Sequence, residues 1–189
     1  LVKIPSYYVE GIALDQLVLT SNRSGVRSIW AMDLGSRELR EIVKGPIAGM
    51  ASPNPSSPYI VYARDVTRGR ELHRLYIYNL ERGDTLEFPG IEPMRIISIG
   101  FNGEYLAFSG STMETMSIYY GRVDGRCEKL VDLDKIVAVI DANDRYVVGF
   151  GHLRGDPRSY ELYIYDLETN EAKIYTPREG SSNTGPMIY

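Results

Sequence analysis

The sequence predicts an all-β protein of the β-propeller type. Three observations support this fold class: a four-strand unit recurs along the chain, turn-forming segments separate the strands, and no segment carries the apolar stripe of an amphipathic helix. Of the 189 residues, 43% are hydrophobic and 24% are charged. This composition is typical of a globular chain and argues against disorder.

The recurring unit is built around a buried strand. Four apolar runs of strand length recur, with starts 43, 46 and 41 residues apart, close to the spacing of propeller blades. The runs are continuous rather than alternating, and this indicates strands covered on both faces. They comprise residues 16–20, 59–63, 105–109 and 146–150.

Three further strands complete each unit. An aromatic-rich run such as 75–78 follows the buried strand after a polar loop, and a turn-forming segment such as 79–83 then closes a hairpin. A charged fourth strand ends the unit, where charge would protect an outer sheet edge from pairing with other chains. A strand with a weaker apolar pattern, such as 94–99, precedes each buried run. The 15 tyrosines, against 4 phenylalanines, suit half-buried sheets.

Counting these units predicts a single, partial propeller over residues 1–189. A β-sandwich is the competing all-β fold, but it requires no long repeat with a fixed order of strands. Two arrangements remain open: a compact four-bladed ring and part of a larger ring, the latter favoured because 186–189 has the pattern of a new first strand. The expected blades are 6–44, 47–89, 93–132 and 136–177, with the start of the next at 181–189.

The face opposite the tight hairpin turns is expected to carry the long loops, and binding residues are found disproportionately on such loops. We name it the loop face; its loops are 21–28, 64–74, 110–116 and 151–159. Arginine forks there suit the carboxylates of an acidic partner or a peptide. The simpler interpretation is a solvated surface whose arginines pair with Asp65, Glu71 and Asp156. The arginines are Arg23, Arg27, Arg64, Arg68, Arg70, Arg74, Arg154 and Arg158.

The chain carries no catalytic or metal-binding motif. Nucleophile-elbow, zincin, EF-hand and phosphate-loop patterns are absent, so we expect no catalytic residue, metal or cofactor here. Cys127 is the single cysteine, and we interpret it as an inert thiol. His73 and His152, the two histidines, are expected at equivalent loop positions of two blades.

Charge and hydropathy bear on location and partners. A net charge of −4 gives no global attraction to nucleic acid or to an anionic membrane. No apolar run approaches the ~20 residues that span a bilayer. A single cysteine allows no intrachain disulfide, which fits a reducing cytoplasm. We therefore expect a cytoplasmic protein without nucleic-acid or membrane partners.

The second unit carries the most specific pattern: Arg64-Asp65-Val66, then Arg68-Gly69, Glu71 and His73, followed by 93–96. With the order of the flanking strands, it resembles the propeller of acylaminoacyl peptidases of the prolyl oligopeptidase family, particularly archaeal members. The likeness extends over about 6–189.

This resemblance implies an N-terminal seven-bladed propeller that caps a C-terminal α/β-hydrolase domain with a Ser-Asp-His triad. The propeller would admit short peptides and exclude folded proteins. The resemblance also implies that Glu71 pairs with an arginine of the hydrolase domain. Arg64, Asp65, Arg68 and His73 are candidate substrate or interdomain contacts beside it.

The chain departs from that pattern because it lacks the hydrolase domain and about three of the seven blades. Our leading hypothesis is a non-catalytic gating and substrate-filter propeller of a serine peptidase acting on short peptides. The alternative is a stand-alone interaction scaffold of the WD-repeat or TolB-like kind. Blades cut from a ring would leave two bare faces, and large exposed apolar surfaces bind partners, so we also expect a homodimer.

Overall fold

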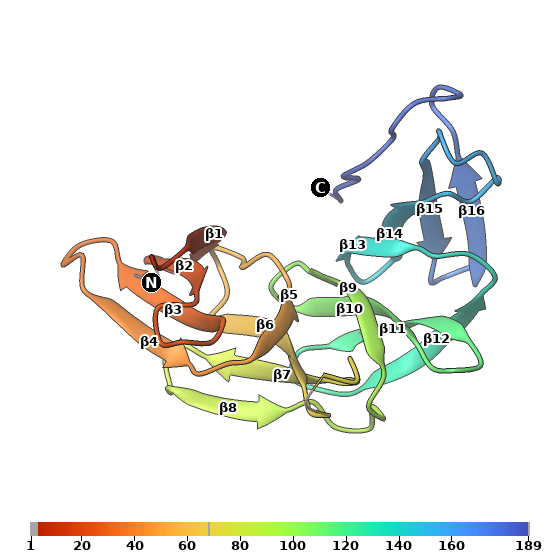
Figure 1. Ribbon diagram of the computed structural model, residues 1–189. Coiled ribbons are helices and arrows are strands. Elements are labelled where there is room, and N and C mark those ends of the chain that lie inside the picture. The colour runs from red at the N-terminus through yellow and green to blue at the C-terminus, as the bar shows by residue number, and fades with distance from the viewer. Residues whose placement is uncertain (1–3, 68, 189) are drawn as a thin grey trace.

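The structure is a computed structural model that describes residues 4–67 and 69–188. Sixteen strands form four separate four-stranded antiparallel sheets, and the described residues contain no helix. Each sheet uses one continuous stretch of chain, with its strands in sequence order. Figure 1 shows the sheets side by side in an open arc. The predicted fold class is thereby confirmed, and the arrangement is an arc rather than a compact four-bladed ring.

The sheets have the following strands. The first sheet contains β1 (Tyr7–Ala13), β2 (Gln16–Ser21), β3 (Ser28–Asp33) and β4 (Leu39–Val43). The second contains β5 (Ile47–Met50), β6 (Tyr59–Asp65), β7 (His73–Asn79) and β8 (Asp84–Glu87). The third contains β9 (Arg95–Phe101), β10 (Tyr105–Ser111), β11 (Met116–Arg122) and β12 (Cys127–Leu133). The fourth contains β13 (Ala138–Ala142), β14 (Tyr146–Gly151), β15 (Glu161–Asp166) and β16 (Glu171–Tyr175).

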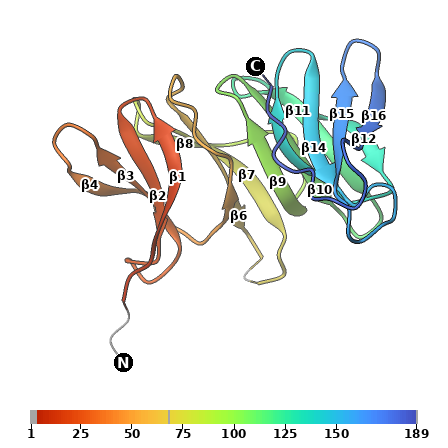
Figure 2. The same ribbon diagram turned by 90° about the horizontal axis from the view of Figure 1, so that it is seen from above.

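The first strand of each sheet lies on the inner side of the arc and the fourth on its outer side (Figure 1). Every inner strand has an irregularity in its pairing with the second strand, as between Val9 and Gly11 of β1. Such bulges bend a strand and increase its twist. Viewed from above, the sheets lie with their faces toward one another (Figure 2). Each inner sheet is therefore covered on both faces.

The core consists of three apolar clusters, one between each pair of consecutive sheets. We name the face of a sheet that looks toward the next sheet its forward face, and the opposite one its rear face. The alternation of side chains along a strand sends neighbours to opposite faces. In β6, for example, Ile60 packs with the first sheet and Val61 with the third. The same alternation places Leu106 of β10 against the second sheet and Ala107 against the fourth.

The face opposite the loop face, where only tight hairpin turns were expected, holds one long connection. Residues 51–58 join β5 to β6 and contact the turns of both adjacent sheets. The side-chain amide Nδ2 of Asn54 donates to the backbone carbonyl of Asn102 at 2.5 Å. The hydroxyl of Ser57 donates to the backbone carbonyl of Gly103 at 3.0 Å. The Leu14 N–H donates to the Pro55 carbonyl at 3.0 Å. This long loop therefore links the second sheet to both the first and the third.

The segment expected to begin a further blade forms no strand among residues 183–188, and Tyr189 lies outside the described residues. Ser182 makes an isolated bridge with Tyr160, and the Ile188 N–H donates to the Asp141 carboxylate at 3.1 Å. Residues 183–188 therefore run back to the inner strand β13. The interpretation of 181–189 as the start of a blade stays a prediction.

We expect replacement of Phe108 by alanine to destabilise the chain by about 3–5 kcal/mol, because it leaves a cavity in the cluster between the second and third sheets. Phe108 is fully buried and stacks on Tyr119 with ring centroids 4.8 Å apart. Urea unfolding of Phe108→Ala measures the loss. Met113→Ala, at a fully exposed loop position, is the control. Equal stability of the two variants would contradict this packing.

Candidate functional site

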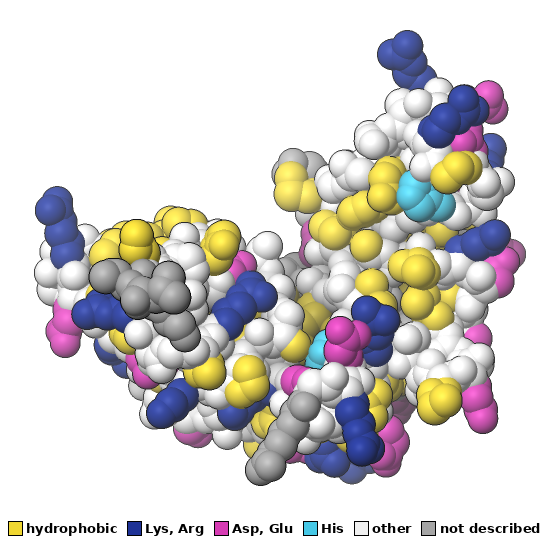
Figure 3. Space-filling model, viewed as in Figure 1, with side chains coloured by type: hydrophobic (Ala, Val, Ile, Leu, Met, Phe, Trp, Pro, Cys, Tyr) yellow, Lys and Arg dark blue, Asp and Glu magenta, His cyan; other side chains and the backbone are white. Residues whose placement is uncertain are grey.

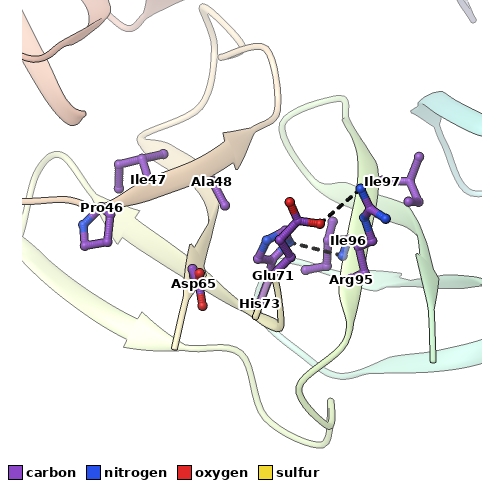
Figure 4. Close-up of a pocket in the computed structure, with 9 residues that line it drawn as sticks. All are labelled: Pro46, Ile47, Ala48, Asp65, Glu71, His73, Arg95, Ile96 and Ile97. Carbon is purple, nitrogen blue, oxygen red and sulfur yellow. Dashed lines mark hydrogen bonds and ion pairs between the residues drawn. The ribbon is translucent and has the colours of Figure 1, made fainter. Parts of the chain in front are cut away.

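A hollow opens on the loop face between the second and third sheets (Figure 4). One wall comes from the start of the inner strand β5 and the other from the start of β9, with the 66–72 loop and the start of β7 between them. Three of the five sequence-predicted site residues lie in it. Its lining comprises Pro46, Ile47, Ala48, Asp65, Glu71, His73, Arg95, Ile96 and Ile97.

Asp65 shapes the 66–72 loop. Its carboxylate accepts hydrogen bonds from the N–H and hydroxyl of Thr67 at 2.7 and 2.8 Å, and from the Gly69 N–H at 2.8 Å. These bonds hold the pKa of Asp65 below its ordinary value, the Thr67 N–H having the largest effect. Both carboxylate oxygens are engaged within the loop. Asp65 is therefore a loop anchor rather than a free contact for a substrate.

Glu71 stands at the mouth of the hollow and is paired across the two sheets. The loop places Glu71 in the left-handed region, at a φ of 58°. Its carboxylate lies 3.0 Å from the Arg95 guanidinium of β9, and the two side chains are 60% and 59% exposed. An ion pair this exposed contributes little stability and exchanges partners readily. Glu71 is therefore accessible to a second cation.

His73 links the second sheet to the third. Its backbone N–H and carbonyl pair with Met94 at 2.7 and 3.1 Å, and its Nδ1 accepts the Ile96 N–H at 3.2 Å. An accepting Nδ1 carries no proton, so in the neutral ring the proton sits on Nε2. Figure 4 shows this bond beside the Glu71–Arg95 pair. His73 thus fixes the start of β9, and its Nε2–H remains as a hydrogen-bond donor.

The other two predicted site residues are not in this lining. Arg64 precedes Asp65 in β6, so strand alternation directs its side chain to the opposite face. There its guanidinium lies 5.7 Å from the centroid of the Tyr76 ring, and Nη2 donates to the Gly45 carbonyl at 3.5 Å. Arg68 lies outside the described residues.

The remaining arginines of the loop face do not form one binding patch. Arg27 pairs with Glu10 at 3.4 Å, and Arg158 pairs with Asp156 at 3.2 Å. Arg23 lies over the Trp30 ring at 5.6 Å. Figure 3 shows the basic side chains scattered over the surface. Among the described arginines of this set, Asp156 alone of the three expected acids has such a partner, since Asp65 accepts hydrogen bonds within its own loop and Glu71 pairs with Arg95.

The expected equivalence of the two histidines is wrong. His73 begins β7, whereas His152 follows β14, and its Nδ1 lies 2.9 Å from the Ser159 carbonyl. The two histidines thus lie at opposite ends of the connection between the second and third strands of their sheets. That loop is anchored instead by Glu161, which is 1% exposed and accepts the N–H groups of Leu153 and Arg154 at 2.7 and 3.2 Å.

Burial alone would raise the pKa of Glu161, but the hydrogen bonds that it accepts outweigh this and hold the pKa below its ordinary value. Glu161 was not among the residues that the sequence pattern singled out. The available signal was an acid placed directly before the apolar strand 162–165.

The hollow is suited to recognition by charge and hydrogen bonding. Its polar groups are the carboxylates of Asp65 and Glu71, one guanidinium and one imidazole, and Ile47 and Ile96 belong to its apolar wall. Across residues 4–67 and 69–188, no group of three or more His, Cys, Asp or Glu side chains could hold a metal ion. Within the same residues, no helix is long and apolar enough to cross a membrane.

Residues 17–189 match the family described as the acylamino-acid-releasing enzyme-like, N-terminal domain. The chain belongs to this family. The expected resemblance to acylaminoacyl peptidases is thereby confirmed.

Solved structures share the fold of this family member at low sequence identity. A prolyl endopeptidase, studied for inter-domain dynamics in catalysis and specificity, matches 92% of this chain with a TM-score of 0.70 and 9% identity. Pyrococcus horikoshii acylaminoacyl peptidase matches 86% with a TM-score of 0.58 and 14% identity. TolB from Acinetobacter baumannii matches 91% with a TM-score of 0.62 and 15% identity. The matches span 29%, 30% and 44% of those chains.

We expect Asp65→Asn to loosen the 66–72 loop, because it removes the charge that holds three hydrogen bonds. Trypsin should then cut after Arg70 about fivefold faster. Asp124→Asn, which changes an exposed turn aspartate, is the control. In the wild type the loop should stay closed above about pH 4 and open as the pH falls through the lowered pKa of Asp65. Equal cleavage of the two variants would contradict the anchor role.

Cys127 should be unreactive in the folded chain. It is 5% exposed, and burial raises the pKa of its thiol to about 12. At pH 8 almost no thiolate exists, so reaction with a disulfide reagent should be at least about a hundredfold slower than after unfolding in urea. Absorbance of the released thiolate measures both rates on this single cysteine. Similar rates in the two states would show an accessible thiol.

Proposed function

We propose that this propeller is the gating and substrate-filter part of a serine peptidase of the acylaminoacyl peptidase type that hydrolyses short peptides. The membership of 17–189 in the family of acylamino-acid-releasing enzyme-like N-terminal domains carries the proposal. The propeller performs no covalent chemistry. It excludes large substrates and water from a catalytic α/β-hydrolase domain and holds that domain in place. The single cysteine, Cys127, fits a cytoplasmic location.

Glu71 is the residue through which the propeller would contact the catalytic domain. Its carboxylate lies on the loop face, is 60% exposed, and already binds a guanidinium in Arg95. A second guanidinium from the catalytic domain would share or replace Arg95. Burial of that pair between two domains would strengthen it, since the low local dielectric strengthens charged hydrogen bonds.

His73 supports this role without contacting the partner. Its bond to the Ile96 N–H fixes the residue that follows Arg95, so the distance between Glu71 and Arg95 depends on it. The Asp65-anchored loop fixes Glu71 from the other side. The carboxylate is thus held in place by both sheets before any partner binds.

A stand-alone interaction scaffold is the second candidate, favoured by the fold similarity to TolB at a TM-score of 0.62. In that case the loop face binds a protein partner without any catalytic domain. The two candidates differ in what the gene encodes after residue 189: the filter requires an α/β-hydrolase domain with a G-x-S-x-G motif, and the scaffold does not. Reading the gene onward decides between them, and a stop codon would contradict the peptidase proposal.

In the peptidase, we expect Glu71→Gln to lower kcat/KM for short acylated peptides about tenfold, the effect of losing one charged hydrogen bond. Glu114→Gln is the matched control, because Glu114 is an exposed glutamate in a loop of the same face. Steady-state kinetics on both variants measures the effect. Unchanged kinetics for Glu71→Gln would remove Glu71 from the domain contact.

A further inference from the structure

The hollow between the second and third sheets holds an arginine that the proposed domain contact would set free. Arg95 lies at the start of β9, and its guanidinium lies 3.0 Å from the Glu71 carboxylate. Within residues 4–67 and 69–188, Glu71 is the one acid at ion-pair distance from Arg95. If an arginine of a catalytic domain takes Glu71, Arg95 loses this partner, and its charge is available to another carboxylate.

The backbone around Arg95 is fixed independently of Glu71. Arg95 pairs with Ser111 of β10, and the N–H of the next residue, Ile96, donates to the His73 Nδ1 at 3.2 Å. The Arg95 side chain is 59% exposed and reaches the mouth of the hollow (Figure 4). Only the guanidinium end therefore has to turn when Arg95 changes its partner.

His73 supplies a second donor to the same hollow. Its Nδ1 accepts the Ile96 N–H, so Nε2 carries the proton of the neutral ring. The His73 side chain lines the hollow together with Arg95. A carboxylate has two oxygens that can accept from a guanidinium and an imidazole at once, and hydrogen bonds to an ionised group are the stronger ones. The two side chains are therefore suited to hold one carboxylate between them.

The rest of the lining is apolar. Pro46 and Ala48 are exposed on the wall from β5, and Ile97 is 38% exposed on the wall from β9 (Figure 4). The hollow has a volume of about 520 Å³, within the range of roughly 300–1,000 Å³ that small-ligand sites occupy. A ligand that fills it must carry apolar surface close to its negative charge. A carboxylate directly beside an apolar side chain meets this requirement.

We propose that this hollow binds the α-carboxylate at the C-terminal end of a short peptide. Arg95 and His73 donate to the carboxylate, and an apolar last side chain packs against Pro46 and Ala48. The inference rests on the proposed function in one respect, because the filter is what brings short peptides to this face. An acidic side chain carries the same group, but it leaves no apolar side chain beside its charge. The terminal carboxylate is therefore the better match to the lining.

Glu71 opposes this binding as long as no partner neutralises it. The lining holds two carboxylates, of Asp65 and Glu71, and one guanidinium, which leaves one net negative charge that repels a carboxylate. A second guanidinium on Glu71 balances the charge of the hollow and releases Arg95. The arginine of the catalytic domain and the peptide carboxylate therefore strengthen each other's binding, and such coupling is reciprocal.

Anchoring of one peptide end also bears on substrate length. A peptide whose carboxylate is held in the hollow presents to the catalytic domain only the bond that lies one fixed span away. Peptides of matching length are then oriented for reaction, and orientation of this kind lowers the barrier of the chemical step. The hollow therefore adds a preference for length to the exclusion of large substrates.

Binding of alanyl-alanyl-leucine, labelled at its N-terminus, to the 189-residue chain tests the proposal by fluorescence anisotropy. Glu71→Gln should bind the peptide at least about tenfold more tightly than the wild type, because it removes the repelling charge and frees Arg95. Adding Arg95→Gln to that variant should abolish the gain. Glu114→Gln and Arg82→Gln, at exposed positions outside the hollow, are the matched controls. Glu71 and Arg95 are both more than half exposed, so the variants should fold, which circular dichroism checks.

Two further peptides identify the bound group. Glu71→Gln should bind the C-terminal amide of the same peptide at least about tenfold more weakly than the free acid, and the amide of alanyl-alanyl-aspartic acid equally weakly. Equal binding of acid and amide, or no gain of Glu71→Gln over the wild type, would overturn the carboxylate site. Tight binding of the aspartic acid amide would overturn it in favour of an acidic side chain.

These results are separate from the test of the proposed function. The domain contact predicts a lower kcat/KM for Glu71→Gln in the peptidase, whereas the carboxylate site predicts tighter peptide binding by the same variant of the chain alone. The two effects have opposite signs and are measured on different molecules. Failure of one therefore leaves the other standing.

Discussion

The packing of one sheet face on the next is the constraint on which this structure depends. Each sheet is a single stretch of chain, so no strand crosses from one sheet to another to hold them together. Side-chain burial between sheets supplies the cohesion, supplemented by backbone contacts where side chains are small. Gly100 of β9 is one such place, since a Cβ there would lie 2.6 Å from the backbone nitrogen of Asp141 in β13. Inner strands can therefore approach closely, while outer strands such as β8 and β16 remain exposed.

The candidate site follows from that packing. It is formed where the inner strands of the second and third sheets begin, and its polar groups come from both sheets. Glu71 depends on the loop held by Asp65, Arg95 depends on β9, and His73 connects the two through Ile96. A change in the contact between these sheets would therefore alter the distance between Glu71 and Arg95 without touching either side chain. The geometry of the site therefore depends on how the second and third sheets are aligned. Such dependence suits a surface that would position another domain.

The sequence predicted the fold well because the repeat is a property of strand order and turn chemistry. Buried strands such as 59–63 and turns such as 102–103 can be recognised one at a time. It predicted the site less well because the site combines separate repeats. Asp65, Glu71 and His73 lie close together in the sequence and were named as candidates together. Arg95 lies one blade later, and although 93–96 belonged to the recognised pattern, nothing in the sequence paired Arg95 with Glu71. The direction of the Arg64 side chain could have been predicted from the sequence, because neighbouring residues of a strand point to opposite faces and Arg64 directly precedes Asp65.

A propeller that filters substrates by size requires a closed ring of blades. A propeller excludes folded proteins only when its blades enclose an opening, because a substrate can pass freely through a gap in the ring. The four described sheets leave such a gap (Figure 1), bordered by apolar rows that resemble the inner contacts. The surfaces that would complete the ring are therefore the same ones that are least favourable to leave in water. In the proposed filter, closure of the ring would be driven by the same burial that holds neighbouring blades together, and exclusion by size would follow from that closure rather than from any single residue on the loop face.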